Sequence, residues 1–254
     1  MRVDGNFTLF SEPRPAVMIV SHERSGTHFL MNALAACYGY VSMPWIDFDR
    51  QTFNINFFYP PEVCDLLLAL ADRPLANVVK SHHPPEFFAG ELRRITERYQ
   101  VFVICRDPTA VMVSFWRYMH QWPWNAGPKT LDALSFARAA PSGRMICHQP
   151  RQYASMMHRW AAHVEGWLEV AANCPRVVIV RYEDLDSDYE TTVRGFAAHL
   201  GRPPRSIVRP ARDYNVIPGG PRDPTGKGLS PDLDALRRLC LASVGPTMSR
   251  LGYA

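Results

Sequence analysis

The sequence predicts an α/β fold, a three-layer sandwich with a central parallel sheet, and three observations support this prediction. Short apolar runs alternate along the chain with longer segments of helical periodicity. The apolar runs are continuous and rich in β-branched residues, which is typical of strands covered by helices on both faces. Hydrophobic residues make up 47% of the chain and charged residues 20%, a balance that favours a buried core over disorder. We expect one domain over residues 1–254.

Four apolar runs are expected to form the strands, in this order: AVMIVS at Ala16–Ser21, NVVK at 77–80, VFVIC at 101–105 and VVIV at 177–180. Helical patterns are expected at residues 26–37, 86–99, 109–120, 152–172, 189–200 and 232–243. In the fourth of these segments, Met156, Trp160 and Trp167 belong to an apolar stripe spaced by three and four residues. That spacing indicates a helix face that packs against the core rather than a cofactor site.

Two stretches interrupt the alternation of strands and helices. Residues 38–61 are rich in aromatic side chains, and residues 121–150 mix Trp122, Trp124, Pro and Gly around one short helix. Ligands of an open α/β sheet bind beyond the carboxyl ends of the strands, where such insertions form walls and lids. We therefore expect both stretches to build a substrate pocket, either apolar for a phenol or alcohol or suited to stacking on a sugar. Packing alone is the alternative.

Charge, apolar runs and cysteines exclude several classes of protein. The formal net charge of +4 is too small, and too evenly spread, for a nucleic-acid-binding protein. Every apolar run is far shorter than the roughly 20 residues of a membrane span. The N-terminal segment has no charged start leading into an apolar stretch, so we expect no signal peptide and a cytoplasmic protein. The six cysteines show no CxxC or CxxH spacing, which favours reduced thiols over a metal site.

The segment after the first strand has the chemistry of an anion site. It reads His22-Glu23-Arg24-Ser25-Gly26-Thr27-His28-Phe29 and leads into the first expected helix. Unpaired backbone N–H groups at a helix start, the helix dipole and the charge of Arg24 all favour a bound phosphate or sulfate. Ser25 and Thr27 add hydroxyl donors. The segment matches neither the Walker A nor the GxGxxG pattern, and an ordinary helix cap is the alternative.

A second candidate anion site follows the third expected strand. Arg106, Asp107 and Pro108 come directly after that strand, and Ser114 lies about two helical turns later. A guanidinium and a hydroxyl placed there suit a second phosphate. Asp107 alternatively pairs with a neighbouring arginine.

Lys80 and His82 lie at the end of the second expected strand. Only three of the 28 Lys and Arg residues are lysines, which draws attention to Lys80. Both side chains are expected to point toward one bound group, with packing as the alternative. After the last strand, Tyr182 is a candidate for stacking on a base.

These pieces, in this order, resemble the sulfotransferase family that uses 3′-phosphoadenosine 5′-phosphosulfate (PAPS), especially its cytosolic-type members and the bacterial small-molecule sulfotransferases. The family's PKSGTTW loop is similar to residues 23–29, and its KTH segment to residues 80–82. Its RNPxxxxxS motif is similar to residues 106–114, with the serine at the same offset. The YEDL segment is present unchanged at residues 182–185, and the ending Leu251-Gly252-Tyr253 is also similar.

The resemblance implies roles for individual residues. Those implied for the 5′-phosphosulfate and the adenine are Arg24, Ser25, Gly26, Thr27, His28, Phe29 and Tyr182. Those implied for the 3′-phosphate are Arg106 and Ser114, with Arg222, Lys227 and Gly228 closing over it. His82 is implied as the catalytic base, with Lys80 and Arg24 beside the transferring sulfuryl group.

The chain departs from the family's motifs at several places. Arg24 replaces a lysine, His28 replaces a threonine, and residues 222–228 lack the tryptophan of the family's RKGxxGxW segment. The family's dimerisation segment has no clear match, so the oligomeric state stays open.

The implied reaction moves a sulfuryl group from PAPS to a hydroxyl of a small molecule, such as a phenol, an alcohol or a sugar, and releases adenosine 3′,5′-bisphosphate (PAP). His82 is expected to accept the hydroxyl proton during direct in-line transfer, since imidazole ordinarily titrates at about pH 6.5. A sulfuryl group carries less charge than a γ-phosphoryl group, so we expect no metal. His120 and His148 are candidate contacts of the acceptor. A nucleotide-binding module without catalysis and a P-loop kinase-like phosphotransferase are the alternatives.

Overall fold

The computed structural model describes residues 12, 14–47, 60–121, 127–211 and 232–254. Its centre is a five-stranded sheet in the order β2-β3-β1-β4-β5, in which every neighbouring pair is parallel. The strands are β1 (Ala16–Ser21), β2 (Val41–Asp47), β3 (Asn77–Ser81), β4 (Tyr99–Cys105) and β5 (Val177–Arg181). The predicted α/β class with a parallel sheet is confirmed.

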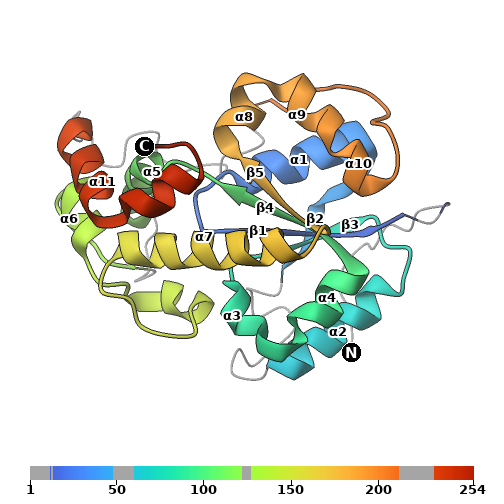
Figure 1. Cartoon of the computed structure of the whole chain (residues 1–254), viewed down its shortest axis with the longest axis horizontal. Coiled ribbons are helices and arrows are strands. Elements are labelled where there is room, and N and C mark those ends of the chain that lie inside the picture. Colours follow the sequence, from blue (N-terminus) through green and yellow to red (C-terminus); the bar gives the residue numbers. More distant parts are fainter. Residues whose placement is uncertain (1–11, 13, 48–59, 122–126, 212–231) are drawn as a thin grey trace.

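Helices cover both faces of the sheet, as the continuous apolar strands predict (Figure 1). One face carries α1 (Thr27–Tyr38), α8 (Tyr182–Ser187), α9 (Tyr189–Gly195) and α10 (Ala197–Leu200). The other carries α2 (Pro60–Ala71), α3 (Pro85–Phe88), η2 (Ala89–Glu91), α4 (Leu92–Arg98) and α7 (Met156–Asn173). Side chains of β1 alternate between the two cores: Ile19 packs with α1, whereas Val20 packs with the opposite layer.

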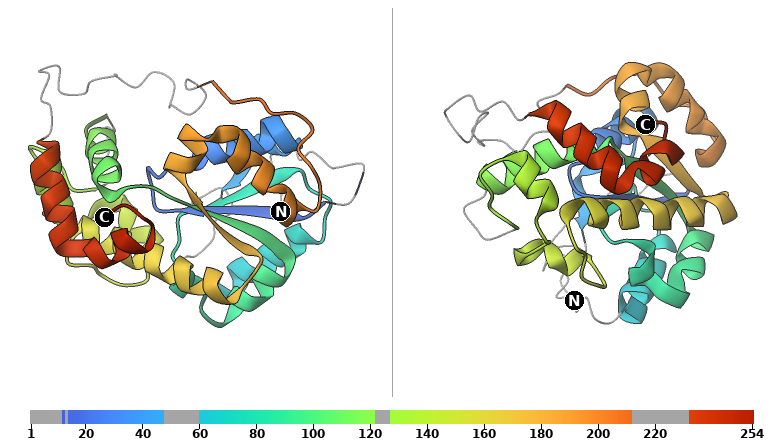
Figure 2. Two further views of the ribbon diagram at one scale, coloured as in Figure 1. Left: turned by 45° about the horizontal axis from the view of Figure 1, so that its top comes forward. Right: turned by 60° about the vertical axis from the view of Figure 1, so that its left-hand side comes forward.

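A further group of helices lies beyond one end of the sheet. It contains α5 (Pro108–Gln121), α6 (Ala133–Arg138), η3 (Gly143–His148) and α11 (Leu233–Arg250). Figures 1 and 2 show α5, α6 and α11 together at the left-hand end, where α11 packs against α5, α6 and α7. Because α5 directly follows β4, this group stands on the side where the strands end.

Four of the strands were expected from their apolar runs, and β2 was not. β2 is an edge strand that pairs only with β3, and its register shifts between Val41 and Ile46. Its sequence, VSMPWID, interrupts the apolar run with serine and proline, and proline in a sheet is confined to such edges. The helices α2 and α8 were also not expected.

Several helices differ from their expected bounds. Residues 86–99 do not form one helix, since the segment is broken into α3, η2 and α4 around Gly90, and residues 189–200 are split into α9 and α10. The helix expected at 152–172 begins at Met156, because the Ser155 side chain caps it by accepting from the His158 N–H. The last helix continues past residue 243 to Arg250 through a kink at Val244.

The structure describes only parts of the two stretches that interrupt the alternation, residues 38–61 and 121–150. Residues 48–59 and 122–126, which include Trp122 and Trp124, lie outside the described residues. The short helix expected within residues 121–150 is α6. In the described part of the chain, no helix is both long and apolar enough to cross a bilayer.

Candidate functional site

Three neighbouring strand ends meet at one edge of the sheet. β1 lies between β3 and β4, with Val20 in register with Ser81 and Ser21 in register with Ile104. His82 follows β3, Arg106 follows β4, and residues 22–26, here called the β1–α1 loop, follow β1. In sheets of this kind, ligands bind outside the carboxyl ends where the chain crosses from one side of the first strand to the other.

The β1–α1 loop has an unusual backbone at two positions. Gly26, the N-cap of α1, has φ +99°, and a Cβ placed there would lie 2.4 Å from Cδ2 of Tyr182. Only glycine fits such a position without displacing the tyrosine. Arg24 has φ +68°, a left-handed conformation that is costly for a residue with a side chain. The loop is therefore held in a strained and closely packed conformation.

Arg24 lies against α5. Its Nε donates to Oγ of Ser114 at 3.2 Å, and its guanidinium lies 4.7 Å from the ring centroid of Tyr118. Ser114 and Tyr118 are four residues apart and so share one face of the helix. Burial lowers the pKa of Arg24, and the nearby charge of Arg106 lowers it further, against an opposing effect of Tyr118.

Arg106 brings a second cation to the same place. Its Nη1 donates to the backbone oxygen of Arg24 at 3.4 Å, and its guanidinium stacks 4.2 Å from the ring centroid of Tyr182. Two buried polar atoms nearby, Nε of Arg106 and Oγ of Ser25, have no hydrogen-bond partner among the described residues. Buried polar groups ordinarily have partners, so this set of donors fits an anionic ligand.

The start of α1 supplies further predicted site residues, Thr27, His28 and Phe29. Oγ1 of Thr27 lies 2.6 Å from Oγ of Ser21, and His28 is partly exposed. Phe29 is only 5% exposed, because it packs edge to face on Tyr182 and stacks on Tyr189. The predicted adenine residues Phe29 and Tyr182 are thus in contact with each other. Arg222, Lys227 and Gly228 lie outside the described residues.

His82 is oriented by β1. Its Nδ1 lies 2.9 Å from the carbonyl oxygen of Ser21 and 3.2 Å from the Ser21 hydroxyl. A carbonyl only accepts, so Nδ1 carries the proton in the neutral ring and Nε2 carries the lone pair. Lys80 is nearly buried on β3, where it is in register with Ile19 of β1.

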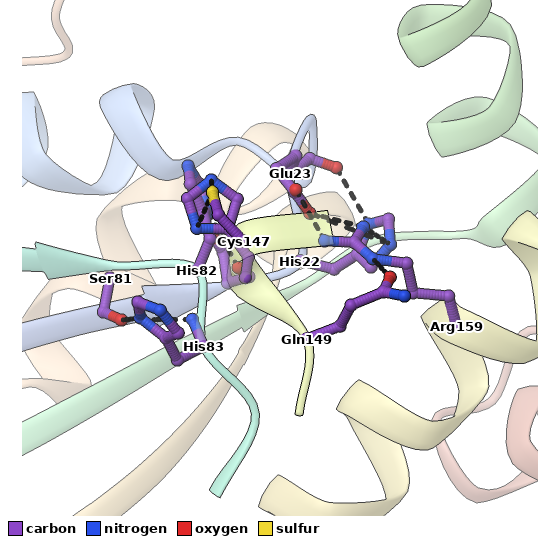
Figure 3. A network of polar contacts seen from close by, with 10 residues as sticks. His22, Glu23, Ser81, His82, His83, Cys147, Gln149 and Arg159 are labelled. Carbon is purple, nitrogen blue, oxygen red and sulfur yellow. Dashed lines mark hydrogen bonds and ion pairs between the residues drawn. The ribbon is translucent and has the colours of Figure 1, made fainter. Parts of the chain in front are cut away.

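A buried network that the sequence analysis missed adjoins the loop (Figure 3). Arg159 of α7 binds both carboxylate oxygens of Glu23, with Nη1–Oε2 and Nη2–Oε1 distances of 2.8 and 2.7 Å. Its Nη1 also lies 3.0 Å from Nε2 of His22, and its Nε donates to Oε1 of Gln149 at 3.0 Å. Although burial raises the pKa of Glu23, Arg159 and His22 hold it well below its usual range. Burial and Arg159 lower the pKa of His22 to about 4.

Other histidines surround the same edge. His163 is buried, and neither of its ring nitrogens has a hydrogen-bond partner among the described residues. Burial, followed by the charge of His22, holds the pKa of His163 well below its usual range. The ring of His148 lies 5.6 Å from that of His82, whereas Nδ1 of His120 bonds the Trp116 carbonyl of its own helix. No three histidine, cysteine or acidic side chains in the described ranges gather to hold a metal ion.

The spacing of Arg159 and His163 in the sequence could have identified them as buried polar residues. They are four residues apart, and His163 follows Trp160 by three and precedes Trp167 by four. This spacing places a cation and an imidazole on the core-facing side of α7, where a lone polar residue needs a partner.

The segments 106–108, 182–185 and 251–253 meet in a second network that anchors the C-terminus. The carboxylate of Glu183 accepts from the Asp107 N–H at 3.0 Å and from the Tyr253 hydroxyl at 2.8 Å. Asp107 pairs with Arg237 at 3.1 Å, so the alternative of an arginine partner is confirmed for this residue. Oδ1 of Asp107 also accepts from the Thr109 N–H at 2.8 Å and caps α5.

The chain is similar to known proteins over most of its length. A family model described as "Sulfotransferase domain" matches residues 14–213. The chain is 23% identical over 190 residues to Sulfotransferase 2B1 of Mus musculus, covering 74% of this chain and 50% of that protein. It is 21% identical over 201 residues to Sulfotransferase 1E1 of Cavia porcellus, covering 78% and 63%. The chain therefore spans about half to under two thirds of the length of these relatives.

The fold is also similar to that of solved structures. The mouse sulfotransferase SULT7A1, complexed with PAP, matches with a TM-score of 0.54 at 16% identity, over 94% of this chain and 88% of that chain. At this identity the likeness shows the fold alone.

Proposed function

We propose that this chain, which belongs to the sulfotransferase domain family, transfers a sulfuryl group from PAPS to the hydroxyl of a small acceptor. One observation carries the proposal: at adjoining strand ends, Arg106 donates to the backbone oxygen of Arg24 and its charge lowers the pKa of the Arg24 guanidinium, while the Ser21 carbonyl orients the imidazole of His82. Neighbouring cations repel each other, and an anion bound beside them offsets that repulsion. A donor with phosphate groups on both sides of its ribose meets that need.

The donor set supports a two-ended anion site. Arg24 and the loop residues Ser25, Gly26, Thr27 and His28 would hold the 5′-phosphosulfate, through side chains and the N–H groups at the start of α1. Arg106 and Ser114 would hold the 3′-phosphate, and Tyr182 with Phe29 would form the adenine side. Arg222, Lys227 and Gly228 would complete the 3′-phosphate site. When bound, PAPS supplies an activated sulfuryl group.

His82 would act as the base of the reaction. The Ser21 carbonyl fixes the proton on Nδ1, so Nε2 is the atom that would accept the proton of the acceptor hydroxyl. A positioned base of this kind is worth roughly 10²–10⁴ in rate. His148, whose ring lies 5.6 Å away from that of His82, would contact the acceptor.

Lys80 and Arg24 would offset the negative charge that grows on the leaving oxygen during transfer. Both are held by the fold before substrate arrives, Lys80 within β3 and Arg24 by Ser114 and Tyr118. Fixed cations in a site from which water is excluded stabilise such charge without reorganisation. Because these side chains supply the positive charge, we propose that no metal takes part.

The acceptor would be a phenol, an alcohol or a sugar, offered to Nε2 of His82. The test is to incubate the chain with PAPS and a panel of these three classes, and to measure PAP release together with sulfated product by mass spectrometry. Turnover with at least one class, unchanged by a chelator, supports the proposal.

Ligand-induced thermal stabilisation separates the alternatives. PAP should raise the melting temperature, whereas ATP with magnesium should not. Stabilisation by ATP with magnesium alone would indicate a phosphotransferase. Stabilisation by PAP without turnover on any acceptor would indicate a binding module.

A further inference from the structure

We propose that Arg159 of α7 is a positioning residue, whose buried bond to Glu23 fixes the β1–α1 loop in the conformation that receives the donor. The inference rests on the proposed function, because it assigns the loop a donor to receive. It concerns a side chain of α7, whereas Arg24 itself contacts Ser114 and Tyr118 of α5, and this side chain is not itself expected to touch the donor.

The bond between Arg159 and Glu23 is rigid and sheltered. Two parallel N–H···O contacts of 2.7 and 2.8 Å join the guanidinium to the carboxylate. The side chains are only 4% and 12% exposed, so water screens the pair weakly. Two-point contact fixes the orientation of the carboxylate as well as its distance.

The same guanidinium also fixes the backbone of the loop. Its Nη1 donates to Nε2 of His22 at 3.0 Å, which requires the proton of the neutral ring to sit on Nδ1. That Nδ1 lies 3.0 Å from the carbonyl oxygen of Glu23 and donates to it. Arg159 therefore holds Glu23 at two points, directly through the carboxylate and through His22 at the main chain.

Glu23 directly precedes the strained residue of the loop. Arg24 has φ +68°, and a left-handed conformation at such a residue persists where surrounding contacts fix it. The peptide group between Glu23 and Arg24 belongs to the segment that Arg159 and His22 hold. The direction of the Arg24 side chain and of the N–H groups that follow it depends on that peptide.

A fourth contact connects the loop to the acceptor side. Nε of Arg159 donates to Oε1 of Gln149 at 3.0 Å, and Gln149 directly follows His148. The ring of His148 lies edge to face on that of His82, with a centroid distance of 5.6 Å. Arg159 of α7 thus contacts both the β1–α1 loop and Gln149. Because its two-point bond goes to the loop, the loss of Arg159 should affect donor binding first.

The variants for the test are Arg159→Lys, which keeps the charge but loses the two-point geometry, and Glu23→Gln, which keeps the shape but loses the charge. The matched control is the exposed ion pair of Arg194 and Glu190 on α9, which joins the same two residue types at 2.7 Å. Its variants are Arg194→Lys and Glu190→Gln. The readouts are the Kd of PAP by calorimetry, the KM of PAPS, the KM of the acceptor and the melting temperature.

We expect both Arg159→Lys and Glu23→Gln to weaken PAP binding at least tenfold and to raise the KM of PAPS similarly. The KM of the acceptor should stay within about twofold, and the control variants should match wild type. PAP affinity within twofold of wild type in both variants overturns the proposal. An equal rise in both KM values, with a lowered melting temperature, also overturns it, because a merely structural role predicts that pattern.

Amide hydrogen exchange of wild-type protein without nucleotide tests the same idea where a variant fails to fold. The N–H of Ser25, which donates to the His22 carbonyl oxygen at 3.3 Å within the loop, should exchange slowly, as expected of a loop fixed before the donor arrives. Exchange as fast as that of an unstructured segment contradicts the proposal. Failure of wild type to bind PAP defeats the proposed function instead, and comparing the exchange of wild type with that of Arg159→Lys still decides whether Arg159 fixes the loop.

Discussion

The carbonyl oxygen of Ser21, the last residue of β1, lies 2.9 Å from Nδ1 of His82, the residue after β3. The contact arises because β1 and β3 are neighbouring parallel strands, with Val20 in register with Ser81. It sets the tautomer of the imidazole by main-chain geometry alone. The proton of the neutral ring is thereby placed on Nδ1 and the lone pair on Nε2.

Replacing His82 by alanine should lower turnover by roughly 10²–10⁴, since the base that accepts the acceptor proton is lost. PAP affinity should change by less than about twofold, because the ring faces the acceptor and the Ser21 backbone. Steady-state kinetics and calorimetry measure the two effects. His199→Gln on α10 serves as the control. Normal turnover by the alanine variant would show that another group is the base.

Replacing Arg106 by alanine should weaken PAP binding by roughly 10- to 100-fold, as expected for loss of a charged hydrogen bond of about 1.5–3 kcal/mol. Binding of adenosine 5′-monophosphate, which lacks the 3′-phosphate, should change much less. The ratio of the two Kd values is the measurement, with the exposed Arg138→Ala as control. A parallel loss of affinity for both nucleotides would contradict the assignment of Arg106 to the 3′-phosphate.

Replacing Gly26 by alanine should destabilise the chain and impair donor binding. The new Cβ would lie 2.4 Å from Tyr182 in a backbone with φ +99°, a conformation that costs roughly 1–2 kcal/mol for a residue with a side chain. Gly195→Ala is the matched control, because a Cβ at that position meets nothing within 4 Å. Urea denaturation and PAP calorimetry provide the readouts. Equal stability and affinity in both variants would show that the loop tolerates a side chain there.

Acidification should destabilise the chain between about pH 6.5 and pH 4. The pKa of His22 falls from its ordinary value to about 4, so the folded state binds fewer protons than the unfolded state in this window. Stability is therefore present above the ordinary pKa and is lost as pH falls, by about 3 kcal/mol at most from His22. The pKa of His163 is lowered as well, which adds a loss of the same sign.

Urea denaturation at pH 7.5 and pH 5 checks this dependence. His22→Gln should reduce the difference in the free energy of unfolding between the two pH values, whereas the exposed His158→Gln should not. A free energy of unfolding that is the same at both pH values would rule out a buried neutral His22.

The sheet could be predicted where burial leaves a plain pattern. β1, β3, β4 and β5 are apolar on both faces because helices cover both faces of the sheet. Their continuous apolar runs are therefore recognisable in the sequence. β2 was not predicted because serine and proline interrupt its apolar run and Met43 is 72% exposed. The breaks between α3 and α4 were not predicted because the helical periodicity of the sequence continues across a short irregular turn.

The site was predictable where its residues directly follow strands. His82, Arg106 and the β1–α1 loop are local sequence features, and the order of parallel strands brings them together. Arg159 was not predictable in this way, because Glu23 lies 136 residues earlier in the chain. A single arginine in a helix is ordinarily solvated, and only its position on the core-facing side of α7 distinguishes it.

Calorimetric titration of the wild-type chain with PAP tests the central claim most directly. The account predicts one bound nucleotide per chain, an affinity that falls as salt is raised, and far weaker binding of adenosine 5′-monophosphate. No heat of association with PAP, or equal affinity for the two nucleotides, would contradict it.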